Sequence, residues 1–437
     1  MRRFGAAALL TFSFGAANCT SFETGNDRVN PAVPLWLHRP AGAIDVLYAR
    51  SLTAGTRVVG EPNERGRPEI DASHGRVFVG TSDHGFYALR ASDGSKIWRF
   101  ETLGVVQSEP LYDLALDIVY FGSHDGALYA VHASDGELAW RFDSGAEVAR
   151  RPVLAGEMLY FANASDNLFA IDRRSGKQLW HVHRMPALGM EISGYSGPAI
   201  DRGTIFFGFS DGHVGAYDAR DGSERWAPID LSAEAEQSQG SEGLRYLDVD
   251  TTPIPYELGT EAKVVFVASY SGGVFALDQE RGVTVWKNEK ATGVTELVLW
   301  QERSHPPRPE SPEFVPGGPA VPARKLLLAS SGATGLWALD PNTGAIVWRA
   351  PVPEGGITAP SPIAGAILVG TTRYGAFLLS PLDGRAMDGI DLGTGFSQTP
   401  STLGARAYVM SNAGTLVALQ VSLPGGGPKL QPRKFTF

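Results

Sequence analysis

The sequence has one cysteine, Cys19, in 437 residues, so no disulfide bond within the chain can support its fold. Charged residues make up only 19% of the chain, with 38 Lys and Arg against 47 Asp and Glu. No block of basic residues of the kind that follows a phosphate backbone is present, which argues against a nucleic-acid partner. After the first 18 residues, no uncharged apolar stretch is long enough for a transmembrane helix. P-loop, zinc-ligand and dinucleotide-binding fingerprints are also missing.

The residues that are plentiful favour β-structure. The chain has 52 glycines and nine tryptophans, and 43% of its residues are hydrophobic. Glycine suits tight turns, and aromatic residues suit strands. The apolar content is sufficient to bury a core. An all-β fold of short strands is therefore expected.

The N-terminus has the layout of an export signal, which we assign to residues 1–18. A positive start, Met1–Arg3, precedes the uncharged residues 4–17. Cleavage after Ala17 would satisfy the rule of small residues at such sites.

A second processing route involves Cys19. The segment resembles a bacterial lipoprotein signal, in which the cysteine becomes the lipidated N-terminus. Asn18 departs from this pattern, because Gly or Ala usually precedes the cysteine. Residues 19–39 would then be a tether to the membrane.

A repeat of three residue columns dominates the rest of the chain. A small residue, or Leu378 in one unit, marks each repeat: Ala88, Ala130, Ala170, Ala216, Ala276, Ala338, Leu378 and Ala418. Six positions later stands a glycine: Gly94, Gly136, Gly176, Gly222, Gly282, Gly344 and Gly384. Ten positions after the small residue stands a tryptophan, or an aspartate in the seventh unit: Trp98, Trp140, Trp180, Trp226, Trp286, Trp348 and Asp388.

Each unit predicts four strands, as in residues 76–80, 86–89 and 96–100 with a further strand at 108–112 before the next unit. Four strands in about 40 residues are typical of a β-propeller blade. The eighth unit lacks its last strand, and residues 44–50 form an unpaired strand before the first. We therefore predict an eight-bladed propeller over residues 40–422, with its ring closed by the N-terminal strand.

Two insertions lengthen the repeat, and a flexible tail is expected at 423–437. Residues 230–247 are rich in Ser, Glu, Gln and Gly, and residues 301–323 are rich in proline. The second is expected to be a semi-rigid excursion without a fold of its own.

The spacing Ala-x(5)-Gly-x(3)-Trp resembles the repeat of quinoproteins that bind pyrroloquinoline quinone. This resemblance implies the fold but not the cofactor, because many such propellers bind no quinone. Three segments, residues 185–190, 247–253 and 395–400, resemble segments that occur in the same order in the BamB family. These are propeller lipoproteins of the machinery that inserts β-barrels into the bacterial outer membrane.

The BamB resemblance implies a docking surface for the periplasmic (POTRA-type) domains of the barrel insertase. The residues that match it are Leu188, Met190, Arg245, Asp248 and Asp250. Asp248 and Asp250 would lie on one side of an extended strand, and we expect Asp248 to be exposed to the partner. Glu191 departs from the family, which has an arginine there.

Three other interpretations of the sequence have weaker support. Residues 208–212 fit the G-x-S-x-G pattern, but they align with turns between strands in other units. His181 and His183 have no third metal ligand at a suitable spacing. A quinone-dependent dehydrogenase is disfavoured because the chain lacks a cysteine pair. We expect no catalytic residues and no cofactor; an exported propeller that binds another envelope protein or a glycan stays open as an alternative.

Overall fold

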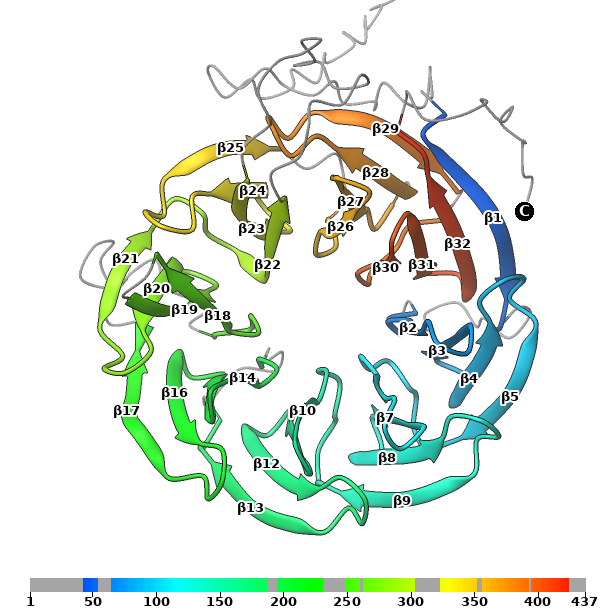
Figure 1. Cartoon of the computed structure of the whole chain (residues 1–437), viewed down its shortest axis with the longest axis horizontal. Coiled ribbons are helices and arrows are strands. Elements are labelled where there is room, and N and C mark those ends of the chain that lie inside the picture. Colours follow the sequence, from blue (N-terminus) through cyan, green and yellow to red (C-terminus); the bar gives the residue numbers. More distant parts are fainter. Residues whose placement is uncertain are drawn as a thin grey trace, which may run out of the picture.

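The computed structural model describes residues 42–53, 64–186, 195–231, 248–259, 262–302, 323–351, 356–373, 375–392 and 394–423. Within these ranges the chain forms eight four-stranded antiparallel sheets around a central axis (Figure 1). This confirms the predicted eight-bladed propeller. Over the same ranges, no helix has the length and apolar character needed to cross a membrane.

The first four blades follow one another along the chain. Blade 1 comprises β2 (Glu69–Asp71), β3 (Arg76–Gly80), β4 (Gly85–Arg90) and β5 (Lys96–Glu101). Blade 2 comprises β6 (Leu111–Asp113), β7 (Ile118–Gly122), β8 (Ala127–His132) and β9 (Leu138–Asp143). Blade 3 comprises β10 (Val153–Ala155), β11 (Met158–Asn163), β12 (Asn167–Asp172) and β13 (Gln178–His183). Blade 4 comprises β14 (Ala199–Asp201), β15 (Thr204–Gly208), β16 (His213–Asp218) and β17 (Glu224–Asp230).

The other four blades complete the circle. Blade 5 comprises β18 (Ile254–Leu258), β19 (Ala262–Ser269), β20 (Gly273–Asp278) and β21 (Thr284–Asn288). Blade 6 comprises β22 (Val294–Glu302), β23 (Arg324–Ser331), β24 (Gly335–Leu339) and β25 (Ile346–Ala350). Blade 7 comprises β26 (Ser361–Ile363), β27 (Ala366–Gly370), β28 (Gly375–Leu379) and β29 (Ala386–Asp391). Blade 8 comprises β30 (Ser401–Leu403), β31 (Arg406–Met410), β32 (Thr415–Val421) and β1 (Ile44–Ser51).

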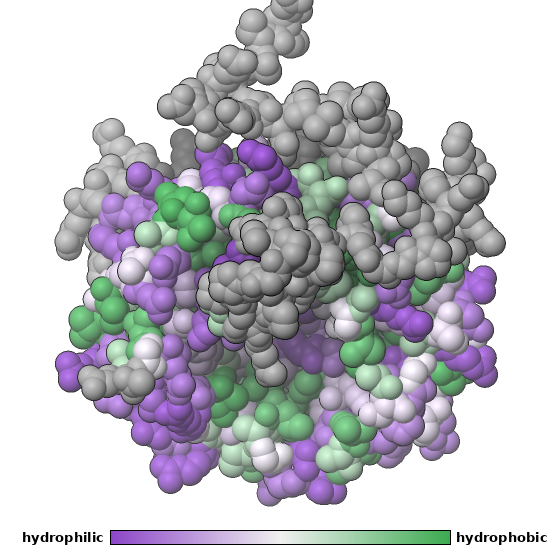
Figure 2. All heavy atoms as spheres, turned by 45° about the horizontal axis from the view of Figure 1, so that its top comes forward, coloured by the Kyte–Doolittle hydropathy of each residue, from purple (hydrophilic) through white to green (hydrophobic). Residues whose placement is uncertain are grey.

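The order of strands gives the ring two distinct faces. The first strand of each blade lies at the axis, and the fourth lies at the rim (Figure 1). Because neighbouring strands are antiparallel, each link between blades lies at the same end as the turn between second and third strands. We call this the link face, and the other the turn face. The face seen in Figure 2 carries hydrophilic residues over most of its described rim, with separate hydrophobic groups between them.

The predicted closure of the ring is confirmed. Strand β1 pairs with β32, from Ile44 opposite Val421 to Ser51 opposite Thr415. Tyr48 lies opposite Ala418 in this pair, in the register that the tryptophans have in other blades. Its hydroxyl lies 3.3 Å from the carbonyl oxygen of Ala91 in blade 1. Tyr48 therefore takes the place of the tryptophan that the eighth repeat lacks.

The tryptophan and glycine columns meet between neighbouring blades. Each indole Nε1 donates, over 2.9–3.2 Å, to a main-chain carbonyl of the next blade: Trp98 to Ala133, Trp140 to Arg173, Trp180 to Ala219, Trp226 to Gln279, Trp286 to Pro341 and Trp348 to Pro381. Gly136 has φ +80°, and a Cβ atom there would lie 2.8 Å from the Trp98 ring. The glycine is required both by its backbone angle and by this close approach.

Asp388 explains the missing tryptophan of blade 7. It lies opposite Leu378, in the tryptophan register, and is 3% exposed. Its Oδ2 accepts hydrogen bonds from the main-chain nitrogens of Ala43, at 2.5 Å, and Ile44, at 3.1 Å. The next blade offers no hairpin carbonyl at this point, because its fourth strand starts here. Blade 7 therefore has a hydrogen-bond acceptor, the Asp388 carboxylate, where the first six blades have an indole donor.

The hydrophobic core is divided into clusters between neighbouring sheets. One cluster joins Phe78, Phe86 and Trp98 of blade 1 to Phe121 and Tyr129 of blade 2, all of them buried. The other sheets pack in the same way around the ring, so each blade is stabilised by both neighbours.

The first strands are shorter than predicted. The sequence predicts a strand at 108–112, whereas β6 spans Leu111–Asp113. Ser108 belongs to the link instead, where its hydroxyl accepts a hydrogen bond from the Gly122 nitrogen. Pro110 has no N–H to donate, so the ladder begins after it.

Candidate docking site and central channel

The predicted docking residues fall on two links between blades, whose described ends lie on the link face. The first segment connects β13 to β14, and the second connects β17 to β18. Leu188, Met190 and Glu191 fall on the first, and Arg245 on the second; all four lie outside the described residues, as does Cys19.

Asp248 is buried, which corrects the expectation that it is exposed. Its exposed fraction is 5%, and Val249 beside it is fully buried among the strands of blades 4 and 5. The link has to pass from the rim to the axis before β18, so its last residues lie against the wall of the ring. The main-chain oxygen of Asp248 accepts a hydrogen bond from the Tyr270 nitrogen, which fixes this position.

Asp248 and Asp250 precede β18 and do not lie in a strand as predicted, but their carboxyl groups are close together. Their carboxyl groups are in hydrogen-bonding contact with each other. Burial and the adjacent Asp248 carboxylate raise the pKa of Asp250 to about 8. The Oδ1 atoms of both residues are buried without a hydrogen-bond partner.

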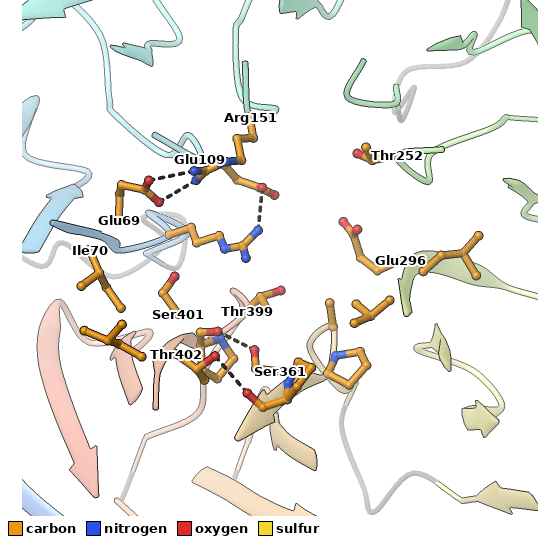
Figure 3. A pocket seen from close by; sticks show the side chains of 18 of the residues that line it. Glu69, Ile70, Glu109, Arg151, Thr252, Glu296, Ser361, Thr399, Ser401 and Thr402 are labelled. Atoms are coloured by element: carbon orange, nitrogen blue, oxygen red, sulfur yellow. Dashed lines mark hydrogen bonds and ion pairs between the residues drawn. The ribbon is translucent and has the colours of Figure 1, made fainter. Parts of the chain in front are cut away.

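A pocket of about 520 Å³ lies on the ring axis, and every blade contributes to its lining. Figure 3 shows this pocket with the charged side chains and Thr252 on one side and four other hydroxyl-bearing side chains on the other. The charged side comes from blades 1, 2, 3 and 6, and the hydroxyl groups of Ser361, Thr399, Ser401 and Thr402 come from blades 7 and 8.

Ion pairs between blades neutralise the guanidinium groups of this axial pocket, which we call the channel. Arg67 pairs with Glu109 at 2.9 Å, and Arg151 pairs with Glu69 at 2.6 Å (Figure 3). The Arg67, Arg150 and Arg151 guanidinium groups hold the pKa of Glu109 below its ordinary value, although burial acts in the opposite direction. These pairs join blades 1, 2 and 3 at the axis.

Arg150 connects the channel to the docking segment. Its Nη1 lies 2.5 Å from Glu296 Oε1, and its Nη2 donates to the Asp250 main-chain oxygen at 2.8 Å. Its Nε donates to the main-chain oxygen of Tyr195, also at 2.8 Å. Tyr195 is the first described residue after the segment that carries Leu188 and Met190. One partly buried side chain therefore bonds three other blades or links, at Tyr195, Asp250 and Glu296.

Sequence reasoning missed the ionic channel, although a signal for it exists. The residue that precedes the proline at the start of each first strand faces the axis. This column reads Arg67, Glu109, Arg151, Gly197, Thr252, Glu296, Ala359 and Thr399, with a leucine in place of the proline only after Glu296. Charges of both signs in one column of a repeat indicate that the blades pair there.

The structure also bears on the rejected catalytic motifs. Ser210 of the G-x-S-x-G pattern lies in the turn from β15 to β16, and its buried hydroxyl lies 2.5 Å from Asp166 Oδ2. A nucleophile elbow needs a turn from a strand to a helix, so this motif is a blade turn. His181 and His183 lie exposed on β13.

One trio in the described part of the chain has spacing suitable for a metal: Asp71, His74 and Asp117 on the turn face. The guanidinium of Arg76 lies among them and bonds both aspartates. Asp71 Oδ2 also lies 3.0 Å from His74 Nδ1. Since a cation already holds these carboxylates, the trio is a structural ion-pair network.

Fold and repeat together define an eight-bladed β-propeller of the quinoprotein repeat type. The family model described as "Outer membrane protein assembly factor BamB" matches residues 114–303 and 295–422. The chain belongs to this family, which confirms the resemblance drawn from the repeat and the docking segments.

Individual relatives agree with this assignment. The outer membrane protein assembly factor BamB of Legionella pneumophila (strain Paris) is 27% identical over 241 residues, covering 55% of this chain and 54% of that protein. A tetrathionate hydrolase of Acidithiobacillus ferrooxidans is 22% identical over 358 residues, covering 78% of this chain and 56% of that protein. The chain thus matches about half the length of these curated relatives.

A solved structure supports the fold. The crystal structure of BamB from Moraxella catarrhalis superposes with a TM-score of 0.65 at 18% identity, covering 86% of this chain and 99% of that one.

Proposed function

We propose that this protein is a non-catalytic docking subunit in the assembly of outer-membrane β-barrel proteins. The observation that carries the proposal is the match to the BamB family over most of the ring, residues 114–303 and 295–422. The charges of the channel are consistent with a non-catalytic role, because its guanidinium groups and glutamates bond one another.

The docking surface is proposed to lie on the link face at blades 3, 4 and 5. Leu188 and Met190 would supply the apolar contacts, and Met185 beside them is 72% exposed. Arg245 and Asp250 would supply polar contacts. Because Asp248 is buried, we propose that it does not contact the partner. It would support the docking segment from below, and the neighbouring residues would contact the partner.

The partner is proposed to be the periplasmic POTRA-type domains of a barrel insertase. Glu191, in place of the family arginine, would select a partner with a basic group at the facing position. The protein would act in the periplasm, held at the outer membrane by a lipid on Cys19. Mass spectrometry of the mature N-terminus distinguishes a lipidated Cys19 from a chain that begins at Asn18.

Capture of the insertase from detergent-solubilised envelopes tests the docking surface. Replacing both Leu188 and Met190 with aspartate is expected to lower the recovery of the insertase at least tenfold, because an apolar contact becomes charged. Leu114→Asp is the matched control: Leu114 is 61% exposed and follows β6 on the turn face. Equal recovery with the double variant and with wild type would remove the proposed surface.

A further inference from the structure

In the described part of the ring, the acidic pair of Asp248 and Asp250 has buried carboxyl oxygens that lack a hydrogen-bond partner. Asp248 is 5% exposed, and Asp250 is partly buried. Their carboxyl groups contact each other, and each has an Oδ1 atom without a hydrogen-bond partner. Buried oxygens of this kind lose their hydration without gaining a donor, so the site favours a ligand that carries positive charge.

The arginines nearby supply only part of that charge. Arg150 is the closest, yet its Nε and both terminal nitrogens bond Tyr195, Asp250 and Glu296. The bond to Asp250 goes to the main-chain oxygen, so the Arg150 charge acts on the Asp250 carboxyl only through space, where it partly offsets the rise in the pKa of that group. Glu296 itself points into the axial pocket (Figure 3) and neutralises part of the Arg150 charge.

The remaining guanidinium groups of the channel are used in the same way. Arg67 bonds Glu109, and Arg151 bonds Glu69 through two nitrogens. The two arginines of the channel and the neighbouring Arg150 are thus matched by three glutamates, and the two aspartates are left over. The site has the composition of a cation site: closely spaced carboxyl oxygens that, among the residues that the structure describes, form no ion pair with a cationic side chain.

We propose that Asp248 and Asp250 bind a divalent cation, Ca²⁺ in preference to Mg²⁺, on the link face beside the axial channel. Ca²⁺ takes about six to eight oxygen ligands in flexible geometry, whereas Mg²⁺ retains its water shell in a strict octahedron. The burial of Asp248 favours the ion that gives up water more readily. Two carboxylates supply ligands from the protein, and water supplies the rest.

The cation would fix the last residues of the β17–β18 link against the ring. Because it concerns the isolated protein, this inference stands or falls separately from docking to an insertase.

The test uses the full-length protein after removal of divalent cations with a chelator. Calorimetric titration with CaCl₂ at pH 7 is expected to show one bound Ca²⁺ per chain, with weaker binding of MgCl₂. An excess of Ca²⁺ about a hundredfold above its dissociation constant multiplies the folding equilibrium constant about a hundredfold, which raises the melting temperature by a few degrees. Asp248→Asn and Asp250→Asn are each expected to abolish the heat of binding and this rise.

Two controls keep the result interpretable. Glu137→Gln removes an exposed carboxylate from the turn face of blade 2 and is expected to leave Ca²⁺ binding unchanged. Both asparagine variants are expected to fold in chelator with a melting temperature close to that of wild type, because asparagine has the size of aspartate and can keep the hydrogen bond within the pair. Absence of Ca²⁺ uptake by the wild type, or uptake retained by both variants, would overturn the proposal. A gain in stability at lower pH without any Ca²⁺ uptake would also overturn it, since the pair then holds only a shared proton.

Discussion

Restoring the repeat's own residue in blade 7 is expected to weaken the ring. Asp388→Trp would give this blade the tryptophan that the first six repeats have. An indole donates a hydrogen bond, whereas the groups that face position 388 are the N–H donors of Ala43 and Ile44. The substitution therefore leaves two buried donors without an acceptor.

The expected loss follows from the two hydrogen bonds. A bond to a charged acceptor contributes about 1.5–3 kcal/mol, so losing both costs about 3–6 kcal/mol of unfolding free energy. Asp388→Leu is expected to lose a similar amount. Asp388→Asn keeps an acceptor oxygen without the charge, and its loss should be clearly smaller.

Urea unfolding followed by tryptophan fluorescence measures these differences, and limited proteolysis reports whether β1 leaves the sheet first. Wild type, the asparagine variant and the leucine variant should unfold in that order of decreasing urea concentration. If the tryptophan variant unfolds within about 1 kcal/mol of wild type, the argument from donors and acceptors is wrong.

Two further substitutions test the repeat and its buried charges. Gly136→Ala is expected to cost at least about 2 kcal/mol, because it adds a 2.8 Å contact with Trp98 to the strain of φ +80°; Gly145→Ala has φ +85° with no atom within 4 Å and should cost less. Thermal unfolding separates the two. Burial raises the pKa of Glu64, so the folded state holds a proton that the unfolded state loses, and stability falls as the pH rises above 4.5. Glu64→Gln should make the fall in unfolding free energy above pH 4.5 shallower, and an unchanged slope would contradict this assignment.

The repeat columns predicted the ring because their residues contact one another between neighbouring blades. Gly136 and Trp98 belong to neighbouring units and touch in the structure, so their spacing cannot drift without loss of packing. Tyr48 fills the same place at the closure, but it stands before the first repeat in the sequence. Only the pairing of β1 with β32 brings it into the column.

The channel and the burial of Asp248 could not be predicted in the same way. Alternation along a strand tells which residues share a side, and it placed Asp248 and Asp250 together. It does not tell whether that side meets solvent or the wall of the ring. Likewise, Arg150 and Glu296 are 146 positions apart and meet only after the blades have closed around the axis.

The composite last blade has a consequence for the order of folding. Ala43 and Asp388 are 345 positions apart. Blade 8 and the hydrogen bonds from β1 to Asp388 therefore form only after nearly the whole chain has been made. Blades 1 to 7 are each continuous in sequence and can assemble in order as they emerge. Strand β1 must wait through that interval as an unpaired edge. A second copy that arrives first can offer its own β32, so exchange of β1 between two chains competes with closure of the ring whenever the protein is concentrated before folding is complete.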